Sequence, residues 1–252
     1  MLNSHRREHI LKLLSHHDRV SVADLVESLS VSDETVRRDL KDLEKEGLLR
    51  RVHGGAIGVS SNRDKPIMER VQKQTKEKGI IAKLAVELIS DHSSIFLHIG
   101  STTEALARQL GRFSDLKVYT NSLSVALIAK EHFGVSVFMT PGRLRKDEAD
   151  LVGYDTISYL EEYYFDTAFM SVAGVDLERG FMDYDEDEVR VRQTIVNCAR
   201  NKVVMADSSK FGKSANMRTV SFEEVDRFVT DRKPDAEFRK RFSQADLDVI
   251  HG

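Results

Sequence analysis

Apolar residues in the first part of the chain recur at helical spacing. Val36, Leu40 and Leu43 stand at positions i, i+4 and i+7, which places them on one face of an amphipathic helix. Ser32 or Asp33 stands where this helix would begin, and either side chain can accept a hydrogen bond from the backbone N–H groups of the first turn. The pattern therefore predicts a helix that starts here and packs through its apolar face.

A second helix and a pair of strands are predicted on either side of this segment. Residues 22–29, VADLVESL, form a short helical pattern upstream, and Gly47 is a natural C-cap for the longer helix. Residues 48–59, LLRRVHGGAIGV, alternate apolar and basic side chains around Gly54 and Gly55, which suits a two-stranded wing. Two short helices joined by a tight turn and followed by a wing are typical of a winged helix-turn-helix that enters the major groove of DNA.

Cationic and hydroxyl side chains gather on this predicted module. Arg37 and Arg38 lie off the apolar face near the start of the longer helix, and a guanidinium group can pair with guanine O6 and N7 or with a phosphate. A single arginine pair is equally consistent with solvated surface charge, but the combination of N-cap, turn, doubled arginine and glycine-containing wing indicates DNA binding. The predicted DNA-binding residues are Ser32, Thr35, Arg37, Arg38, Lys41, Arg50, Arg51 and His53.

Beyond a polar stretch at residues 60–66, helical patterns alternate with short apolar or β-branched runs. This alternation predicts an α/β fold with a mostly parallel sheet covered by helices. We expect a DNA-binding domain over residues 1–59, a linker and the start of a connecting helix over 60–78, and a second domain over 79–252. The predicted strands are 94–97, 116–119, 135–139, 167–172, 202–206 and 227–230, and the predicted helices are 80–89, 103–110, 124–132 and 188–200.

Small, hydroxyl and amide side chains follow the predicted strands of the second domain. The carboxyl ends of parallel strands share one edge of a sheet, and ligands bind at that edge. Residues 100–103, GSTT, offer backbone N–H groups and hydroxyls to a phosphate, and Arg145 and Lys210 add positive charge. Each loop alone has an ordinary explanation as a helix start or a turn, but together they predict an anion-binding pocket. The other segments after strands are 120–122, 140–145, 173–176 and 207–210.

Composition narrows the class of protein. The chain has 252 residues, of which 40% are hydrophobic, and a net charge of −3. It contains no apolar stretch of about 18 residues and no signal-peptide core, so we expect a cytoplasmic protein without a membrane partner. The single cysteine, Cys198, excludes a disulfide framework and a cysteine-based zinc site.

Charge is nearly balanced within the predicted DNA-binding domain. Residues 1–65 hold 12 Lys and Arg against 11 Asp and Glu. Affinity for DNA must then come from a few well-placed arginines and from two copies of the domain on one operator. We expect a symmetric homo-oligomer, a dimer or a tetramer, whose paired recognition helices lie about 34 Å apart, or a multiple of that distance, in successive major grooves.

The same residues resemble a known family. The segments RREHILKLL, VADLVESLSVS, TVRRDL and LEKEGLLRRVHGGA are similar to the N-terminal signature of the DeoR-type bacterial transcriptional regulators, and the resemblance continues over nearly the whole chain. It implies a winged helix-turn-helix followed by an effector domain similar to phosphosugar isomerases of the ribose-5-phosphate isomerase type. A phosphorylated sugar or polyol would bind this effector domain and lower the affinity for operator DNA.

Part of the isomerase-like signature is present in the second domain. Residues 100–102, GST, and 207–210, DSSK, match the segments that hold the sugar phosphate in those enzymes. The enzymes also carry a D-G-A-D segment and a downstream glutamate for proton transfer. Here the segment reads A-G-V-D at 173–176, with Glu188 downstream. Because Ala173 replaces the first acid and aldose–ketose isomerisation needs a positioned base, the resemblance implies a pocket that binds without catalysis.

Residues near the pocket imply a branch of the family and contacts with the ligand. The block 181–192, FMDYDEDEVRVR, resembles the glycerol-3-phosphate regulon repressor branch. His98 replaces an aspartate that many members carry, which leaves the identity of the sugar open. Asp185 and Glu188 can accept hydrogen bonds from ligand hydroxyls, and the block lacks the glycine and distant glutamate of an EF-hand, so we expect no metal and no cofactor. The predicted effector-binding residues are His98, Gly100, Ser101, Thr102, Thr103, Asn121, Ser122, Gly142, Arg145, Asp176, Asp185, Glu188 and Lys210.

Together these features predict a transcriptional repressor of a sugar or polyol catabolic operon that a phosphorylated effector releases from its operator. Three alternatives stay open: a sugar-phosphate isomerase with an accessory DNA-binding module, a ligand-dependent activator, and a constitutive DNA-binding protein with a vestigial pocket. Asp176 and Glu188 remain where the enzymes carry acids, so a turnover assay would distinguish the enzyme. A reporter assay in cells that lack the protein would separate repression from activation.

Overall fold

The chain forms two compact units, a smaller one over Met1–Arg63 and a larger one over Asp64–Gly252. Each unit has its own core, because every cluster of buried apolar residues found among the described residues belongs to one unit alone. The residues that this computed structural model describes are 3–16, 19–46, 48–52, 54–58 and 66–252.

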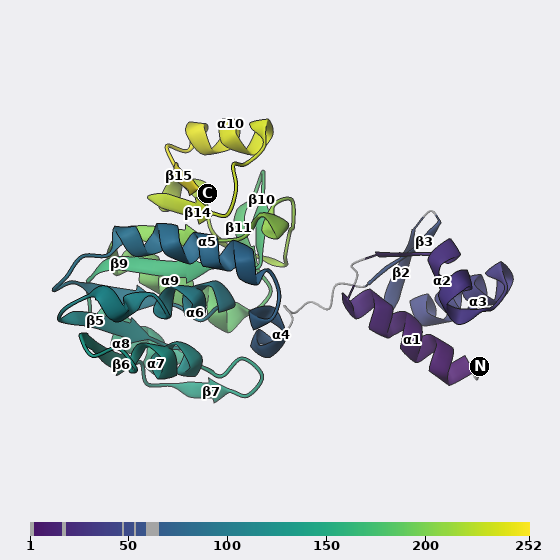
Figure 1. The fold of residues 1–252 in the computed structure, drawn as a ribbon, viewed down its shortest axis with the longest axis horizontal. Helices are drawn as coiled ribbons and strands as arrows, with labels where there is room; N and C mark the ends of the chain where they lie inside the picture. The colour runs from purple at the N-terminus through teal and green to yellow at the C-terminus, as the bar shows by residue number, and fades with distance from the viewer. Residues whose placement is uncertain (1–2, 17–18, 47, 53, 59–65) are drawn as a thin grey trace. The chain divides into compact units, whose positions relative to one another are not determined.

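The smaller unit combines helices with a small antiparallel sheet (Figure 1). Its described elements are α1 (Asn3–His16), β1 (Arg19–Ser21), α2 (Val22–Leu29), α3 (Asp33–Lys45), β2 (Leu49–Val52) and β3 (Gly55–Gly58). The predicted helix at 22–29 is confirmed as α2, and the predicted start of the longer helix is confirmed, because the Ser32 side chain accepts a hydrogen bond from Thr35 N–H. β2 and β3 confirm the wing. The predicted C-cap, Gly47, lies outside the described residues.

The predicted apolar face of α3 packs into the core of the smaller unit. Val36, Leu40 and Leu43 are buried together with apolar residues of α1, α2 and β2. A buried ion pair joins α1 to α3, in which Arg6 Nε donates to Asp39 Oδ2 at 2.7 Å and Arg6 Nη2 donates to Asp39 Oδ1 at 3.1 Å. This bidentate geometry orients α1 on α3. The apolar periodicity gives no sign of it, since Asp39 is charged and adjoins Leu40.

A parallel sheet forms the centre of the larger unit. Over residues 66–252 its strands are β4 (Ser94–Leu97), β5 (Leu116–Thr120), β6 (Val135–Met139), β9 (Phe165–Ser171), β12 (Ala199–Met205), β14 (Arg227–Thr230) and β15 (Asp248–His251). They lie in the order β15-β14-β12-β9-β4-β5-β6, and every neighbouring pair is parallel. The predicted α/β fold with a mostly parallel sheet is confirmed.

Helices cover both faces of this sheet. The helices over residues 66–252 are α4 (Ile67–Val71), α5 (Thr75–Ala85), α6 (Ser101–Ala107), α7 (Leu123–Ala129), α8 (Tyr154–Glu161), α9 (Glu186–Asn197) and α10 (Ala236–Gln244), with the short 3₁₀ turns η1 (Val86–Leu88), η2 (Leu110–Arg112), η3 (Ser208–Lys210) and η4 (Phe222–Glu224). The helices α5, α6 and α7 cover one face, and α8 and α9 cover the other (Figure 1). The four predicted helices correspond to α5 with η1, α6, α7 and α9.

Several elements of the larger unit have no counterpart in the sequence prediction. A two-stranded hairpin consists of β7 (Arg143–Arg145) and β8 (Asp150–Val152), and a second small sheet consists of β10 (Gly174–Asp176), β11 (Gly180–Asp183) and β13 (Met217–Val220). The helices α8 and α10 and the strand β15 were likewise not predicted. The missed strands are three or four residues long and contain charged side chains, so they lack the apolar run or strict alternation that identifies a strand.

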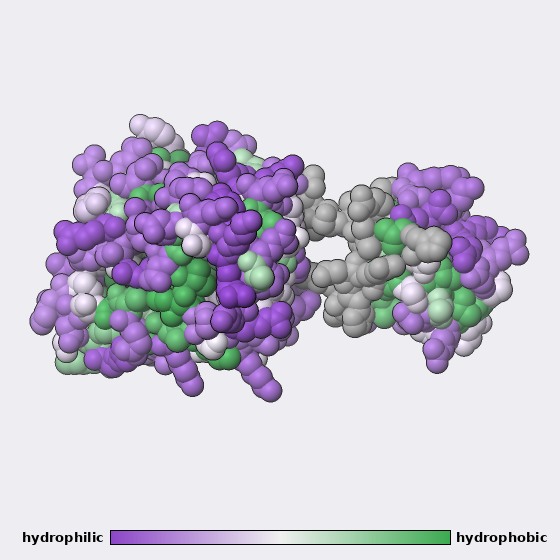
Figure 2. All heavy atoms as spheres, turned by 90° about the horizontal axis from the view of Figure 1, so that it is seen from above, coloured by the Kyte–Doolittle hydropathy of each residue, from purple (hydrophilic) through white to green (hydrophobic). Residues whose placement is uncertain are grey.

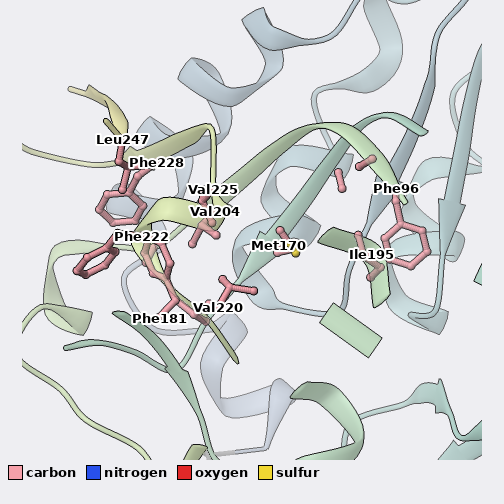
Figure 3. Packing of buried hydrophobic residues seen from close by; sticks show 14 of the residues in the cluster. Phe96, Met170, Phe181, Ile195, Val204, Val220, Phe222, Val225, Phe228 and Leu247 are labelled. Atoms are coloured by element: carbon pink, nitrogen blue, oxygen red, sulfur yellow. The ribbon is translucent and has the colours of Figure 1, made fainter. Parts of the chain in front are cut away.

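An aromatic cluster anchors β11 to the central sheet. Phe181 of β11 packs edge-on against Phe222 with ring centroids 5.0 Å apart, and against Phe228 of β14 at 5.3 Å. Figure 3 shows these rings in one cluster with Val220 and Leu247. Edge-to-face contacts stabilise such pairs beyond the burial of apolar area. The cluster fixes the position of β11. The acidic block, residues 183–188, begins at the last residue of β11 and continues into α9.

Hydrophilic side chains cover most of the face of each unit that Figure 2 shows, with an apolar area on the larger unit. Among the described residues, no helix has both the length and the apolar character that a membrane span requires.

Candidate functional site

The exposed side of α3 carries hydroxyl and cationic groups. Thr35, Arg38 and Lys41 follow one another at three-residue steps, so they lie on the same side of the helix, and Arg38 and Lys41 are exposed. The buried residues Val36 and Leu40 lie on the opposite side. Ser32 Oγ and Thr35 Oγ1 are 2.9 Å apart, so hydroxyl groups mark the N-terminal end of this surface.

Two other predicted DNA contacts are engaged within the smaller unit. Both Arg37 Nε and Arg37 Nη2 donate to the carboxylate of Asp33 one turn earlier, and Arg51 Nε donates to Glu44 Oε2 at 2.7 Å. A DNA phosphate would have to compete with these carboxylates for either guanidinium. The side chain of Arg50, in β2, and the whole of His53 lie outside what the structure describes.

Polar residues of the larger unit converge at the carboxyl edge of the central sheet. The chain runs from β4 through β5 to β6 and then returns to β9 beside β4, so the strand order reverses between β4 and β9. Ligands bind at such a switch point in open α/β sheets. Here His98 and Gly100 follow β4, Ser171 ends β9, and Asn121 follows β5. The structure thus brings the predicted residues of the β4 and β5 loops together.

Hydrogen bonds connect these loops. Ile99 N–H donates to Asn121 Oδ1 at 3.2 Å, and Asn121 Nδ2 donates to Asp150 Oδ2 at 3.3 Å. Gly100 has a φ of 156°, and a Cβ at this position would lie 1.8 Å from Ser171 Oγ. The close approach of β4 and β9 at their ends therefore requires glycine here. Ser101, Thr102 and Thr103 are buried directly behind it in the first turn of α6.

A network of buried charges lies beside these loops. Arg145 contacts three carboxylates: its Nε and Nη2 each donate to Asp150 at 2.8 Å, Nη2 donates to Glu188 Oε1 at 2.7 Å, and Nη1 lies 3.0 Å from Asp185 Oδ1. The predicted residues Arg145, Asp185 and Glu188 are thus brought together. The guanidinium of Arg145 is already surrounded by carboxylates, so it positions Asp150 and Glu188 and would reach a phosphate only by leaving them.

A second arginine, which the sequence did not identify as a site residue, completes the network. Arg192 is 2% exposed; its Nη2 donates to Glu188 Oε2 at 2.7 Å, and its Nη1 lies 2.7 Å from Asp183 Oδ2. Burial alone would raise the pKa of Glu188, but the charges of Arg192 and Arg145 outweigh it and hold that pKa at about 2. Glu188 is therefore a carboxylate at neutral pH and can only accept hydrogen bonds.

Unsatisfied polar atoms lie at the same edge. His98 is fully buried, and burial together with the charge of Arg192 holds its pKa well below the usual value, so the imidazole is neutral. Its Nδ1 lies 3.0 Å from the carbonyl oxygen of Ile99, a distance that assigns the proton to Nδ1 and leaves Nε2 as an acceptor. His98 Nε2 and Thr140 Oγ1, which follow β4 and β6, find no hydrogen-bond partner among the described residues. Such atoms indicate a place where a ligand or water binds.

Both units match one family. Residues 6–62 match the DeoR-like helix-turn-helix domain, and residues 73–232 match the DeoR C terminal sensor domain. The chain belongs to the DeoR family of transcriptional regulators. It is 35% identical to the glycerol-3-phosphate regulon repressor of Escherichia coli K12 over 236 residues, 93% of each chain. It is 34% identical to the HTH-type transcriptional regulator GlpR of Haloferax volcanii over 253 residues, 100% of this chain and 99% of that protein.

Part of the chain is also similar to solved structures of isomerases. The solved structure of ribose 5-phosphate isomerase A from Methanocaldococcus jannaschii is 20% identical, with a TM-score of 0.41 over 55% of each chain. The matched relatives are named as transcriptional regulators over nearly their whole length. The DeoR family member described here is accordingly a regulator and not an enzyme.

The remaining predicted effector residues lie at different distances from the network. Ser122 is buried and caps α7 by accepting from Val125 N–H, while Gly142 lies in the turn that follows β6. Lys210 ends the turn η3 after β12. Asp176 accepts hydrogen bonds from the backbone of Arg179 in the β10–β11 turn. Among the described residues, no recorded hydrogen bond or ion pair joins Asp176 to the charged network.

The acidic block of this DeoR-family sensor domain binds arginines. Asp183 pairs with Arg192, Asp185 with Arg145, and Asp187 with Arg143, whose Nη2 donates to Asp187 Oδ2 at 2.7 Å. The partners belong to the β7–β8 hairpin and to α9, so the block joins these elements to one another. The acidic block lies far from Arg145 in the sequence, and Glu188 is 43 positions from it, so no local motif identified the network.

The strand-end site is closed in this structure. His98, Thr103 and Asn121 have no exposed surface, and two hollows of the surface lie elsewhere, one beside α7 and one beside α10. A ligand would reach the buried polar groups only after a covering segment moves.

Proposed function

We propose that this DeoR-family protein represses a sugar or polyol catabolic operon and that a phosphorylated sugar or polyol releases it from operator DNA. The observation that carries the proposal is the buried, partly unsatisfied polar network at the switch point of the sensor domain, in a chain whose other unit is a winged helix-turn-helix. Such a network suits a small polar ligand with hydroxyl groups.

Operator DNA binds α3 and the wing in this proposal. Arg38 reads a base edge or clamps a phosphate in the major groove, and Thr35 and Lys41 lie beside it on the same exposed side of α3. Arg37 and Arg51 contribute less, since Asp33 and Glu44 engage them. The further proposed contacts are Ser32, Arg50 and His53.

The effector phosphate binds the loop after β4 and the turn after β12. Residues 100–103 offer backbone N–H groups and hydroxyls, and Lys210 supplies positive charge. Hydroxyl groups of the same ligand bind His98 Nε2 and the carboxylate of Glu188, both of which accept hydrogen bonds. The further proposed contacts are Asn121, Ser122, Gly142, Arg145, Asp176 and Asp185.

Glycerol 3-phosphate is the first effector to test, because the relatives at 35% identity are named glycerol-3-phosphate regulon repressors. Another relative, from Escherichia coli O157:H7, is named a putative aga operon transcriptional repressor at 33% identity. Phosphorylated sugars belong in the same panel, because the sequence resemblance implies a phosphorylated sugar or polyol. A phosphorylated ligand is trapped inside the cell and reports the first step of a catabolic pathway, which fits a regulator that acts in the cytoplasm.

The protein acts as a homo-oligomer, a dimer or a tetramer, on a symmetric operator. Its nearly neutral DNA-binding domain needs a second copy for affinity. One region suited to self-association is the β6 edge of the sheet, because Phe138 of β6, Leu127 of α7 and Phe133 in the connection between these elements are all exposed. Light scattering would test it: a dimer that Phe133→Asp dissociates supports this region, and an unchanged mass contradicts it.

The proposed function is tested by fluorescence anisotropy on DNA from the protein's own promoter at fixed salt. We expect one phosphorylated compound to release the DNA and its unphosphorylated parent to leave it bound. An effector that binds the DNA-free form about 100-fold more tightly than the DNA-bound form supplies about 2.7 kcal/mol of coupling, which is enough for a switch. Tight DNA binding that no phosphate changes would contradict the effector half of the proposal.

The Lys210→Ala variant tests the phosphate site. Loss of this ammonium should weaken effector release by at least about tenfold, since a charge-assisted hydrogen bond contributes roughly 1.5–3 kcal/mol, while binding to operator DNA alone stays as in the wild type. Lys213→Ala, three residues further along the same loop and exposed, is the matched control. Release of Lys210→Ala at wild-type effector concentrations would contradict the assignment.

A further inference from the structure

The helix α4 is the first described element after the wing strand β3, and it lies at the edge of the effector site. Figure 1 shows it at the end of the larger unit near the start of α6, against which it packs. Its first residue, Ile67, is buried. Three residues further along the helix, Arg70 Nη2 pairs with Glu148 Oε2 in the turn between β7 and β8. This hairpin also carries Arg145 and Asp150 of the charged network.

The charge of Arg70 reaches the network itself. Burial raises the pKa of Glu188, and the charge of Arg70 adds to the larger effects of Arg192 and Arg145 that lower it. The same charge opposes the rise that burial imposes on the pKa of Glu104 in α6. The side chains of Arg70 and Glu148 are about as buried as the side chain of Arg145. The α4 helix is thus attached to the same hairpin that orders the effector site.

A buried lysine holds the other end of this segment. Lys78 of α5 is 6% exposed, and its Nζ donates to the carbonyl oxygen of Lys73 at 2.6 Å and to that of Arg70. The ammonium therefore ties the turn after α4 to α5. Burial lowers the pKa of Lys78 to about 8, and the charges of Asp207 and Lys210, which belong to the segment proposed to hold the effector phosphate, also act on that pKa.

We propose that α4 and the start of α5 cover the effector site, that Lys78 is a further ligand of the effector phosphate, and that phosphate binding displaces α4. The inference rests on the proposed function and adds the route by which the ligand acts. An ammonium group has three N–H donors. Two of those of Lys78 hold backbone carbonyls, and among the described residues no acceptor is recorded for the third.

The displacement follows from competition for this ammonium. A dianionic phosphate attracts the ammonium of Lys78 more strongly than two neutral carbonyl oxygens do, because two opposite full charges attract each other, whereas a carbonyl group carries only a dipole. When Nζ turns toward the phosphate, the carbonyls of Arg70 and Lys73 lose their donor and α4 loses its attachment to α5. Since α4 is the first described element that follows the wing in the chain, a displacement of α4 is transmitted along the chain to the DNA-binding unit.

The first test measures whether Lys78 binds the phosphate. Isothermal titration of the full-length Lys78→Met variant with glycerol 3-phosphate and with inorganic phosphate should give at least a tenfold weaker Kd than for the wild type. The matched control is Lys76→Met, which removes an exposed lysine from the same helix and should bind as the wild type. Circular dichroism and the thermal midpoint show whether Lys78→Met is folded. Wild-type affinity in folded Lys78→Met would overturn the inference.

The second test follows α4 without removing any charge. The chain contains no tryptophan, and Met68 of α4 is 72% exposed, so Met68→Trp reports the position of α4 by its emission. Tyr164→Trp, at an exposed site just before β9, is the control. Glycerol 3-phosphate should change the emission of Met68→Trp at the concentrations that release DNA and leave Tyr164→Trp unchanged. No change at Met68→Trp, or equal changes at both sites, would overturn the displacement of α4.

The two proposals fail in different ways. If the wild type binds neither glycerol 3-phosphate, nor inorganic phosphate, nor any phosphorylated sugar, both the proposed function and this inference are overturned. If the wild type binds a phosphate and is released from DNA, while folded Lys78→Met behaves identically, only the inference is overturned.

Discussion

The two proposed binding sites of the protein use cationic side chains in opposite ways. In the smaller unit, Arg38 and Lys41 extend from α3 into solvent. In the larger unit, Arg145 and Arg192 are buried among carboxylates. Solvated cations suit DNA, whose phosphates are contacted at many points and whose counterions are released into solvent. Buried pairs suit a small ligand, since a network held in place by several hydrogen bonds presents its acceptors in one arrangement.

This difference also separates binding from stability. Removing a solvated cation takes away an interaction with the partner and little else, because surface ion pairs contribute little to folding. Removing a buried cation leaves carboxylates without compensation inside the protein, which is strongly destabilising. The comparison therefore predicts that substitution of a solvated arginine lowers the affinity for the partner, whereas substitution of a buried arginine lowers the free energy of unfolding.

The largest effect is expected for Arg192→Leu. This substitution removes the buried cation that pairs with Asp183 and Glu188, so the free energy of unfolding should fall by about 3–5 kcal/mol. Urea unfolding measures the change. Arg190→Leu is the matched control on the same helix: its pair with Glu186 is exposed, and it should cost about 0.5 kcal/mol or less. Equal losses in the two variants would break the distinction between buried and solvated arginines.

The distance in sequence between interacting residues decides how much of the protein could be predicted from the sequence. The start of α3 is encoded within four residues, because Ser32 caps the helix that Val36 helps to bury. The strands β4 and β6 were predicted with their observed bounds, because each pattern is contained in the strand itself: β4 is a buried apolar run, and the edge strand β6 alternates partly buried and exposed residues. Where the information is local, the prediction was right.

The charged network could not be predicted in this way. Arg145 meets Glu188 across 43 positions of sequence, and no helical or strand period joins them. Arg192 and Lys78 are charged residues that a hydropathy pattern assigns to the surface, yet both are buried. Their positions follow from the topology of the sheet and from the β7–β8 hairpin, which itself was not predicted. The residues assigned to the effector from sequence stay predictions until ligand binding is measured.

An intermediate effect is expected for the arginines of α3. Arg38→Ala should weaken operator binding by about 1–3 kcal/mol if Arg38 contacts a base. Arg37→Ala should weaken it less, because Arg37 is engaged by Asp33 in the DNA-free protein. Anisotropy with operator and random DNA at one salt concentration measures both. An equal loss on the two DNAs for Arg38→Ala would indicate a phosphate contact only, and a larger loss for Arg37→Ala would contradict the assignment.

The smallest effect is expected in the pH dependence of ligand binding. It tests Lys78, a buried cation whose hydrogen-bond partners are backbone carbonyl oxygens instead of carboxylates. Burial lowers the pKa of Lys78 to about 8, and the charged groups that act on it are Asp207, Lys210, Arg70 and Glu104. Below pH 8 Lys78 carries its proton and can bind a phosphate. Above pH 8 it loses that proton, and binding must restore it, so affinity should fall by up to about tenfold per pH unit.

Titration of the ligand does not contribute to this pH dependence, because a phosphate monoester has its second pKa near 6 and keeps its dianionic charge from about pH 7 to pH 9. Isothermal titration of the wild type with glycerol 3-phosphate should give an affinity that is flat up to about pH 7 and falls between pH 8 and pH 9. Lys78→Met should bind more weakly and lack this fall, since it has no proton to lose at that position. A wild-type affinity that stays constant up to pH 9, or a Lys78→Met variant with the same fall, would show that Lys78 does not contact the phosphate.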